Sequence, residues 1–160
     1  MREAETQSEY QAKLKVSFAV LGICHQGERL TRIDYLPRRT RALSPQTPFA
    51  AKVCRQLKAY LRDPDARFDL PVRMSGTPYQ QRVWRAIQQI PRGHTLTYGE
   101  IARKLFSGPR AVGQACGANP VPLIVPCHRV LGSGKLGGFM NCDKGDPLAI
   151  KRWLLKHERG

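Results

Sequence analysis

The first part of the chain alternates apolar and polar side chains with the two-residue period of a β-strand. The alternation covers residues 13–24 and, after the tetrapeptide HQGE, residues 29–36. The apolar positions of the first segment are Leu14, Val16, Phe18 and Val20. Gly27, within the tetrapeptide, tolerates the backbone conformations of a tight turn. The pattern therefore predicts a hairpin of two strands.

A helical period of three to four residues replaces the alternation after Thr47. Thr47 and Pro48 are typical of the N-cap and the first turn of a helix. The apolar positions that follow share one face of this helix: Phe49, Ala50, Val53, Cys54, Leu57, Tyr60 and Leu61. We therefore interpret Cys54 as a core residue.

The stretch RDPDARFDLP at residues 62–71 is rich in turn-forming residues and marks a boundary. We expect an N-terminal α/β domain at 1–70 and a C-terminal domain at 71–160.

Two capping boxes open short helices in the second of these domains. Thr77 with Gln80, and Thr97 with Glu100, each pair an N-cap hydroxyl with a side chain three residues on. The apolar positions expected to face inward are Val83, Trp84, Ile87 and Ile90 in the first helix, and Ile101, Ala102 and Leu105 in the second.

The tripeptide SGP at 107–109 separates the second of these helices from another one over 110–118. Together they form a helix-turn-helix pattern at about 97–118. The last helix of the pair begins with Arg110 and otherwise holds mostly small residues, so its backbone can approach a large flat partner closely. Its expected inward positions are Ala111, Val112, Ala115 and Cys116. Pairs of this kind are packing units more often than DNA readers, so both interpretations stand at this point.

A further helix is predicted near the end of the chain, capped by Asp146 and started by Pro147. Its expected buried positions are Leu148, Ile150, Trp153 and Leu154.

The charge of the chain carries information about its partners rather than about its fold. There are 27 Lys and Arg residues against 12 Asp and Glu residues, a formal net charge of +15. Such an excess favours polyanionic partners. Between Arg73 and Lys135 the only acidic residue is Glu100. A nucleic-acid partner is therefore the first hypothesis for the second domain.

The five cysteines are an odd number without paired or metal-like spacing, which indicates a reducing cytosol rather than a disulfide framework. The apolar run at 16–24 follows several glutamates and precedes no small-residue cleavage pattern, so we interpret it as a strand and not as a signal peptide. It is also too short to span a bilayer.

The segment NPVPLIVPCHRV at 119–130 places a thiol, an imidazole and a guanidinium in succession. A thiol needs a nearby base or cation to become a nucleophile at neutral pH. On an extended segment, Cys127 and His128 point to opposite faces, so they can cooperate only across a turn or through a water. Alternatively, Cys127 is a small buried residue and His128 a hydrogen-bonded core histidine.

The letters around this dipeptide decide between the two interpretations. The segments at 77–102, 109–130 and 151–158 resemble the O6-alkylguanine-DNA alkyltransferases, also called methylated-DNA–protein-cysteine methyltransferases. The Pro-Cys-His-Arg block, with Asn-Pro eight residues before the cysteine, carries most of this resemblance. It covers most of residues 72–160.

The resemblance implies a catalytic role for four residues. Cys127 matches the residue that accepts the alkyl group, and His128 the imidazole that deprotonates it through a water. Glu158 matches the carboxylate that orients this imidazole, and Asn119 the residue that braces the turn. Without the resemblance, Glu158 would be interpreted as a solvated acid at a frayed helix end.

The resemblance also implies a DNA site and a substrate pocket. Tyr98 matches the tyrosine that faces the base and turns the nucleotide outward, and Arg110 the arginine that enters the vacated space. Without it, they would be a half-buried aromatic residue and a phosphate contact. Ala111 and Arg129 complete the predicted DNA-binding set. The predicted pocket residues are Tyr98, Cys116, Leu136, Phe139 and Met140.

The implied fold is α/β (α+β), with a small ribonuclease-H-like N-terminal domain packed on a helical C-terminal domain. We expect a cytoplasmic monomer, nucleoid-associated if bacterial, that acts on double-stranded DNA containing O6-alkylguanine. No cofactor, metal or membrane is predicted, although Cys24 and His25 would suit half of a zinc site. The loop at 132–146 departs from the common pattern, which leaves the range of adducts open.

Two other functions remain possible from the sequence. One is a non-catalytic sensor that binds alkylguanine without accepting the group. The other is a basic helix-turn-helix regulator with an incidental thiol.

Overall fold

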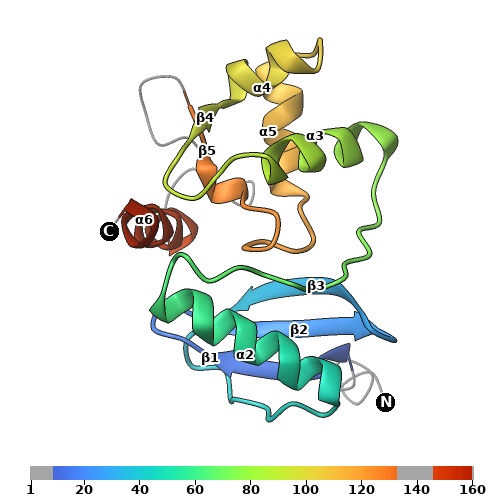
Figure 1. The fold of residues 1–160 in the computed structure, drawn as a ribbon, viewed down its shortest axis with the longest axis vertical. Coiled ribbons are helices and arrows are strands. Elements are labelled where there is room, and N and C mark those ends of the chain that lie inside the picture. Colours follow the sequence, from blue (N-terminus) through green and yellow to red (C-terminus); the bar gives the residue numbers. More distant parts are fainter. Residues whose placement is uncertain (1–8, 133–145, 160) are drawn as a thin grey trace. The chain divides into compact units, whose positions relative to one another are not determined.

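The chain divides into two compact units, Met1–Ser75 and Gly76–Gly160. The computed structural model describes residues 9–132 and 146–159. The first unit combines an antiparallel sheet with a long helix, and the second is mainly helical (Figure 1). The predicted mixed α/β fold is confirmed.

The sheet of the N-terminal unit has three antiparallel strands in the order β1, β2, β3. They span Ala12–Lys15, Val20–Gln26 and Arg29–Leu36. The hairpin between β2 and β3 is the predicted one, and Gly27 in its turn has φ +57°.

The prediction of one continuous strand over 13–24 is wrong. The chain reverses at residues 16–19, where the amide of Val16 donates to the carbonyl of Ala19 at 3.0 Å. Alternation continued through this turn because Phe18 is partly covered by Tyr35, with ring centres 6.3 Å apart. An alternating apolar pattern indicates which side chains are buried. It can continue through a tight reversal between two paired strands, so it did not reveal this turn.

Helix α2 (Pro48–Arg62) packs along the sheet (Figure 1). It begins where the sequence predicted, because the Thr47 hydroxyl accepts from the amide of Ala50 at 3.0 Å. Cys54 is 5 % exposed, as expected of a core residue, whereas Leu61 at the end of the helix is only half-buried. Its buried face holds Phe49, Ala50, Val53, Cys54, Leu57 and Tyr60.

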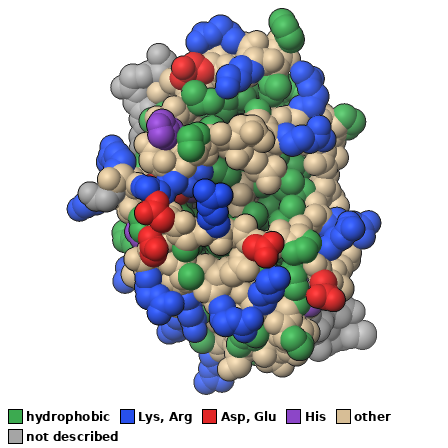
Figure 2. Space-filling view, in the orientation of Figure 1, with side chains coloured by type: hydrophobic (Ala, Val, Ile, Leu, Met, Phe, Trp, Pro, Cys, Tyr) green, Lys and Arg blue, Asp and Glu red, His purple; other side chains and the backbone are tan. Residues whose placement is uncertain are grey.

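Lys and Arg side chains are spread over the face of the molecule shown in Figure 2, with few acidic side chains among them. Among the described residues, no helix has both the length and the apolar content that a bilayer crossing requires.

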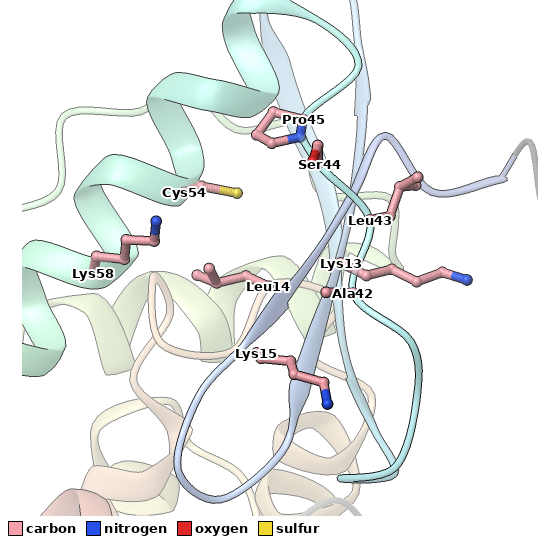
Figure 3. Close-up of a pocket in the computed structure, with 9 residues that line it drawn as sticks. All are labelled: Lys13, Leu14, Lys15, Ala42, Leu43, Ser44, Pro45, Cys54 and Lys58. Carbon is pink, nitrogen blue, oxygen red and sulfur yellow. The ribbon is translucent and has the colours of Figure 1, made fainter.

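The N-terminal unit contains a cavity of about 310 Å³ between β1, the segment 42–45 and α2 (Figure 3). Cys54 and Lys58 of α2 point toward it, whereas the amines of Lys13 and Lys15 point away. None of the predicted site residues lines this cavity, so it is not the candidate site. The full lining is Lys13, Leu14, Lys15, Ala42, Leu43, Ser44, Pro45, Cys54 and Lys58.

Helices α3 (Pro78–Gln88), α4 (Tyr98–Lys104) and α5 (Pro109–Gly117) form the body of the C-terminal unit. Both predicted capping boxes are present, so α3 and α4 begin where the sequence indicated. In the second box the Thr97 hydroxyl accepts from the amide of Glu100 at 3.0 Å, and the Glu100 carboxylate accepts from the amide of Thr97 at 2.8 Å. Helices α4 and α5 form the predicted helix-turn-helix.

A short parallel pairing of two strands links the start of α4 to the segment after Cys127. Strand β4 (Leu96–Thr97) pairs with β5 (Val130–Leu131), which directly follows the 3₁₀ turn η1 (Cys127–Arg129). This pairing, which the sequence did not predict, brings the start of α4 close to the Cys127 segment. Helix α6 (Asp146–Arg159) packs against η1.

Some residues expected to face the core are only half-buried, because they lie toward helix ends or on the edge of an apolar face. In the C-terminal unit these are Leu105, Ala111, Cys116 and Trp153.

Trp84 joins the first and last helices of this body. Its side chain is fully buried, and its indole N–H donates to the carbonyl of Ala115 at 2.8 Å. The bond connects α3 to α5 and satisfies a buried indole donor that would otherwise be costly.

Replacing Trp84 with Phe should lower the free energy of unfolding by about 2 kcal/mol, because the smaller ring leaves a void and removes the indole hydrogen bond to the Ala115 carbonyl. Urea denaturation followed by circular dichroism measures this. Trp153→Phe, at a half-buried position, is the matched control and should cost less than half as much. Equal losses in the two variants would contradict this role.

Candidate functional site

Asn119 shapes the loop that leads to the thiol. Its side-chain amide donates to the carbonyl of Val125 at 2.8 Å and to the sulfur of Cys127 at 3.2 Å. Its side-chain oxygen accepts from the amide of Val121 at 2.9 Å. Within this loop Leu123 adopts a left-handed backbone with φ +78°. The amide of Asn119 thus fixes both the turn and the position of the sulfur, the arrangement expected of a bracing residue.

Cys127 and His128 lie in the 3₁₀ turn η1, where we had expected an extended segment. The amide of Arg129 donates to the carbonyl of Pro126 at 2.9 Å, which closes the turn. Successive residues of a 3₁₀ turn are rotated by about 120° and not by 180°. The sequence argument for opposite faces therefore does not apply here.

The imidazole of His128 is paired with a buried carboxylate. Its Nε2 lies 2.8 Å from Oε2 of Glu158, and both residues are 1 % exposed. Glu158 is thus not a solvated acid at a frayed end, although it lies in the last turn of α6. Arg92 adds a hydrogen bond at 2.6 Å to the Glu158 backbone carbonyl.

Arg129 completes this ion pair. Its Nε and Nη2 donate to the two oxygens of Glu158 at 2.9 and 2.8 Å, and its Nη1 donates to the carbonyl of Ile90 at 2.6 Å. Only 13 % of its side chain is exposed. A guanidinium occupied in this way has little left for phosphate. Arg129 thus has a structural role in holding Glu158, and its predicted DNA contact stays a prediction.

The electrostatics of the site determine which nitrogen of His128 is basic. Burial lowers the pKa of His128 and outweighs the opposing effect of the Glu158 carboxylate, and Arg129 and Lys151 add smaller effects in the lowering direction. The ring is therefore neutral at pH 7. Because an ionised carboxylate only accepts, Nε2 carries the proton donated to Glu158, which leaves Nδ1 as the basic nitrogen.

The thiol of Cys127 is protonated at rest. Burial raises its pKa well above the ordinary value, and the neighbouring Cys116 thiol raises it further. The amide of Asn119 and the ammonium of Lys151 act in the opposite direction. Cys127 as a whole residue is 5 % exposed. Ionisation of this thiol thus requires a base.

Lys151 is a site residue that the sequence analysis missed. It is completely buried, donates to the carbonyl of Val130 at 2.7 Å, and lies 5.8 Å from the centre of the Tyr98 ring. Burial lowers its pKa to about 8, although proximity to Cys116 and Cys127 opposes this. The signal was present: Lys151 shares a helix face with Glu158, seven residues on.

The other predicted site residues differ in how far they are buried. Arg110 is exposed in the first turn of α5, Ala111 and Tyr98 are half-buried, and Cys116 contacts the Cys127 thiol. Three predicted pocket residues lie outside the described part of the chain: Leu136, Phe139 and Met140.

No cluster of three or more metal-ligating side chains occurs within residues 9–132 and 146–159. Both ring nitrogens of His25, which the sequence offered as half of a zinc site, are in hydrogen bonds within the protein. Nδ1 lies 2.8 Å from the carbonyl oxygen of Gly27, and Nε2 lies 2.7 Å from the hydroxyl oxygen of Thr47.

The site and the fold together define a class. A buried cysteine with its own hydrogen-bond donor, a neighbouring histidine–glutamate pair and a buried lysine form a thiol that can be activated to accept a group. A basic helix-turn-helix lies in the same unit. The class is that of a protein that modifies its own cysteine at a nucleic acid.

Comparison with known proteins narrows this class. A family model described as "6-O-methylguanine DNA methyltransferase, DNA binding domain" matches residues 78–160. A methylated-DNA–protein-cysteine methyltransferase of Mycolicibacterium paratuberculosis is 43 % identical over 134 residues, which cover 82 % of this chain and 78 % of that protein. A constitutive one from Bacillus subtilis is 34 % identical over 161 residues, covering 94 % and 95 %.

A solved structure agrees with these relatives. The O6-methylguanine methyltransferase of Mycobacterium tuberculosis superposes with a TM-score of 0.77 at 35 % identity, covering 92 % of this chain and 90 % of that one. The chain therefore belongs to the 6-O-methylguanine DNA methyltransferase family. This confirms the family recognised in the sequence and, with it, the predicted enzyme class.

The buried His128 should make stability depend on pH. Its pKa is lowered in the folded state, so between that pKa and the unfolded value of about 6.5 the unfolded chain binds more protons. The free energy of unfolding should fall as pH drops through this window, by at most about 1.4 kcal/mol per pH unit. Denaturation at several pH values measures the slope.

The slope should be smaller in His128→Gln and unchanged in His94→Gln, at an exposed position. A wild-type slope that survives in His128→Gln would show that another group is responsible.

Proposed function

We propose that this protein repairs DNA by moving the alkyl group of O6-alkylguanine onto Cys127. The observation that carries the proposal is the hydrogen-bonded group on and around η1. There, Asn119 donates to the sulfur, and His128 is held by Glu158. The relatives are named for the same transfer. The M. tuberculosis relative, at 39 % identity and with a TM-score of 0.76, has been solved in complex with DNA.

Activation of the thiol is the first step. Nδ1 of His128 takes the proton of Cys127 through a water, and Glu158 stabilises the imidazolium that forms. The amide of Asn119 and the ammonium of Lys151 favour the thiolate. Because burial dominates at rest, the thiol stays protonated until a substrate is bound, which limits reactions with other electrophiles.

Transfer is an in-line displacement at the alkyl carbon. The sulfur lone pair forms the new S–C bond while the C–O6 bond breaks, and its electrons stay on the guanine oxygen. The proton that left the thiol passes from His128 to the guanine, so that unmodified guanine is restored. A thioether is not cleaved by water or by thiols, so each protein molecule acts once.

The reacting carbon must leave the base stack to meet a buried sulfur. Flipping costs a few kcal/mol of unstacking. Tyr98 at the start of α4 faces the Lys151 ammonium, and in this proposal it turns the nucleotide outward. Arg110, exposed at the start of α5, is placed on the outer surface, where it fills the space that the base vacates. The same displacement can proceed on O4-alkylthymine, whose alkyl group is also bonded to an exocyclic oxygen.

The expected partner is double-stranded DNA, bound by a monomer in a reducing compartment where Cys127 stays a thiol. A damage sensor would bind the lesion without a covalent product, and a regulator would prefer one sequence of undamaged DNA.

Incubation with a duplex that contains O6-methylguanine should raise the protein mass by one methylene group. Peptide mapping should place the increase on Cys127, because this sulfur has the bracing amide and the nearby base. Cys127→Ala should show no increase, and the matched control Cys54→Ala, at a core cysteine of the other unit, should show the full increase. An unmodified wild-type protein would refute the proposal.

Lys151→Met should slow transfer about tenfold at pH 7, because losing the nearby charge raises the pKa of Cys127 further and lowers the thiolate fraction. Single-turnover rates across a pH series should show the profile moved to higher pH. A purely structural role would lower the rate equally at all pH values, and thermal unfolding of the variant reports that case separately.

A further inference from the structure

The turn between α4 and α5 carries an apolar side chain that the described chain does not cover. Phe106 is 97 % exposed, and it is the only large hydrophobic residue classed as exposed within residues 9–132 and 146–159. Other large apolar side chains of these helices, such as Ile101 and Val112, are buried. A phenylalanine in water contributes nothing to the stability of the fold.

The backbone at Phe106 is held in a conformation that this residue type rarely adopts. Its φ is +54°, in the left-handed region, which costs an aromatic residue energy that glycine or asparagine would not lose. Helices commonly end on a residue in this conformation, usually glycine or asparagine, so a phenylalanine is an unfavourable choice for the end of α4.

Hydrogen bonds on both sides of Phe106 keep the turn in this shape. Arg82 of α3 donates to the carbonyl of Leu105 at 3.0 Å, and the hydroxyls of Tyr79 and Ser107 lie 2.6 Å apart. The amide of Ser107 donates to the carbonyl of Ala102 at 2.8 Å. The ring is therefore presented outward on a rigid turn and loses little backbone entropy when it binds.

The charges around the turn indicate the partner. Arg103 and Lys104 are exposed in the last turn of α4, and Arg110 is exposed at the start of α5. The acid of α4, Glu100, uses its carboxylate to cap that helix at Thr97. Figure 2 shows Lys and Arg side chains beside apolar ones at the end of the C-terminal unit that carries this turn. An apolar ring among cations suits DNA, with sugars and bases between phosphates.

We propose that Phe106 is a DNA-contacting residue that packs its ring against the sugars or bases of the bound duplex, between phosphates contacted by Arg103 and Lys104. This rests on the proposed function for the identity of the partner. The ring supplies affinity that does not depend on counterion release, whereas the cations supply the salt-dependent part. Phe106 acts in docking and takes no part in alkyl transfer.

The first experiment measures binding of an undamaged duplex by fluorescence anisotropy over a series of salt concentrations. Phe106→Ala should weaken binding about tenfold at every salt concentration, with the salt slope unchanged. Phe106→Tyr should bind like the wild type. Arg103→Gln is the matched control and should reduce the slope by about 0.9, the value for one lost phosphate contact. Unchanged binding by Phe106→Ala would overturn the proposal.

The second experiment separates docking from folding and from chemistry. Phe106→Asn should raise Tm by about 2 to 4 °C, because asparagine tolerates the left-handed backbone, and should still weaken binding of the duplex. Its transfer rate from the O6-methylguanine nucleoside should equal that of the wild type, whereas its rate from a dilute duplex should fall about tenfold. Equal loss with both substrates would overturn the proposal. Failure of the wild type to react with either substrate would instead refute the proposed function.

Discussion

The buried carboxylate of Glu158 is the group on which the rest of the site depends. A carboxylate taken out of water is costly unless its oxygens are paired, and here Arg129 binds both of them while His128 shares one. Arg129 also binds the carbonyl of Ile90, beyond the end of α3. One ion pair thus joins α6, the turn η1 and the α3 end, and it orients the imidazole next to the cysteine.

Burial and polar contacts have opposite effects on the pKa of the Cys127 thiol. Burial and the Cys116 contact keep Cys127 protonated, while Asn119 and Lys151 favour its ionised form. Electrostatic interactions are stronger in a site that excludes water. The same arrangement therefore keeps the resting thiol protonated and supports its ionisation when a base takes the proton. The short β4–β5 pairing places the start of α4 beside this site, which couples the helix-turn-helix to the chemistry.

The helix-turn-helix presents two kinds of side chain to its partner. Tyr98 and Arg110, at the starts of its helices, handle the flipped nucleotide in the proposed function. Phe106, on the turn between them, is held outward by contacts from α3. The small residues of α5 allow close approach along the rest of the surface. The proposed division between a reactive end and a docking turn depends on the fold rather than on any one motif.

Local chemistry is what the sequence by itself determined. The capping boxes at Thr77 and Thr97, the cap at Thr47 and the turn at Gly27 each involve residues a few positions apart, so their letters were enough to locate these elements. The motif around Cys127 identified the family for the same reason. Only the tertiary structure decided the surroundings of Arg129, Lys151 and Phe106. The residues that bind Arg129 and Lys151 lie far along the chain, and burial, which sets the cost of a charge, is a property of the packed molecule.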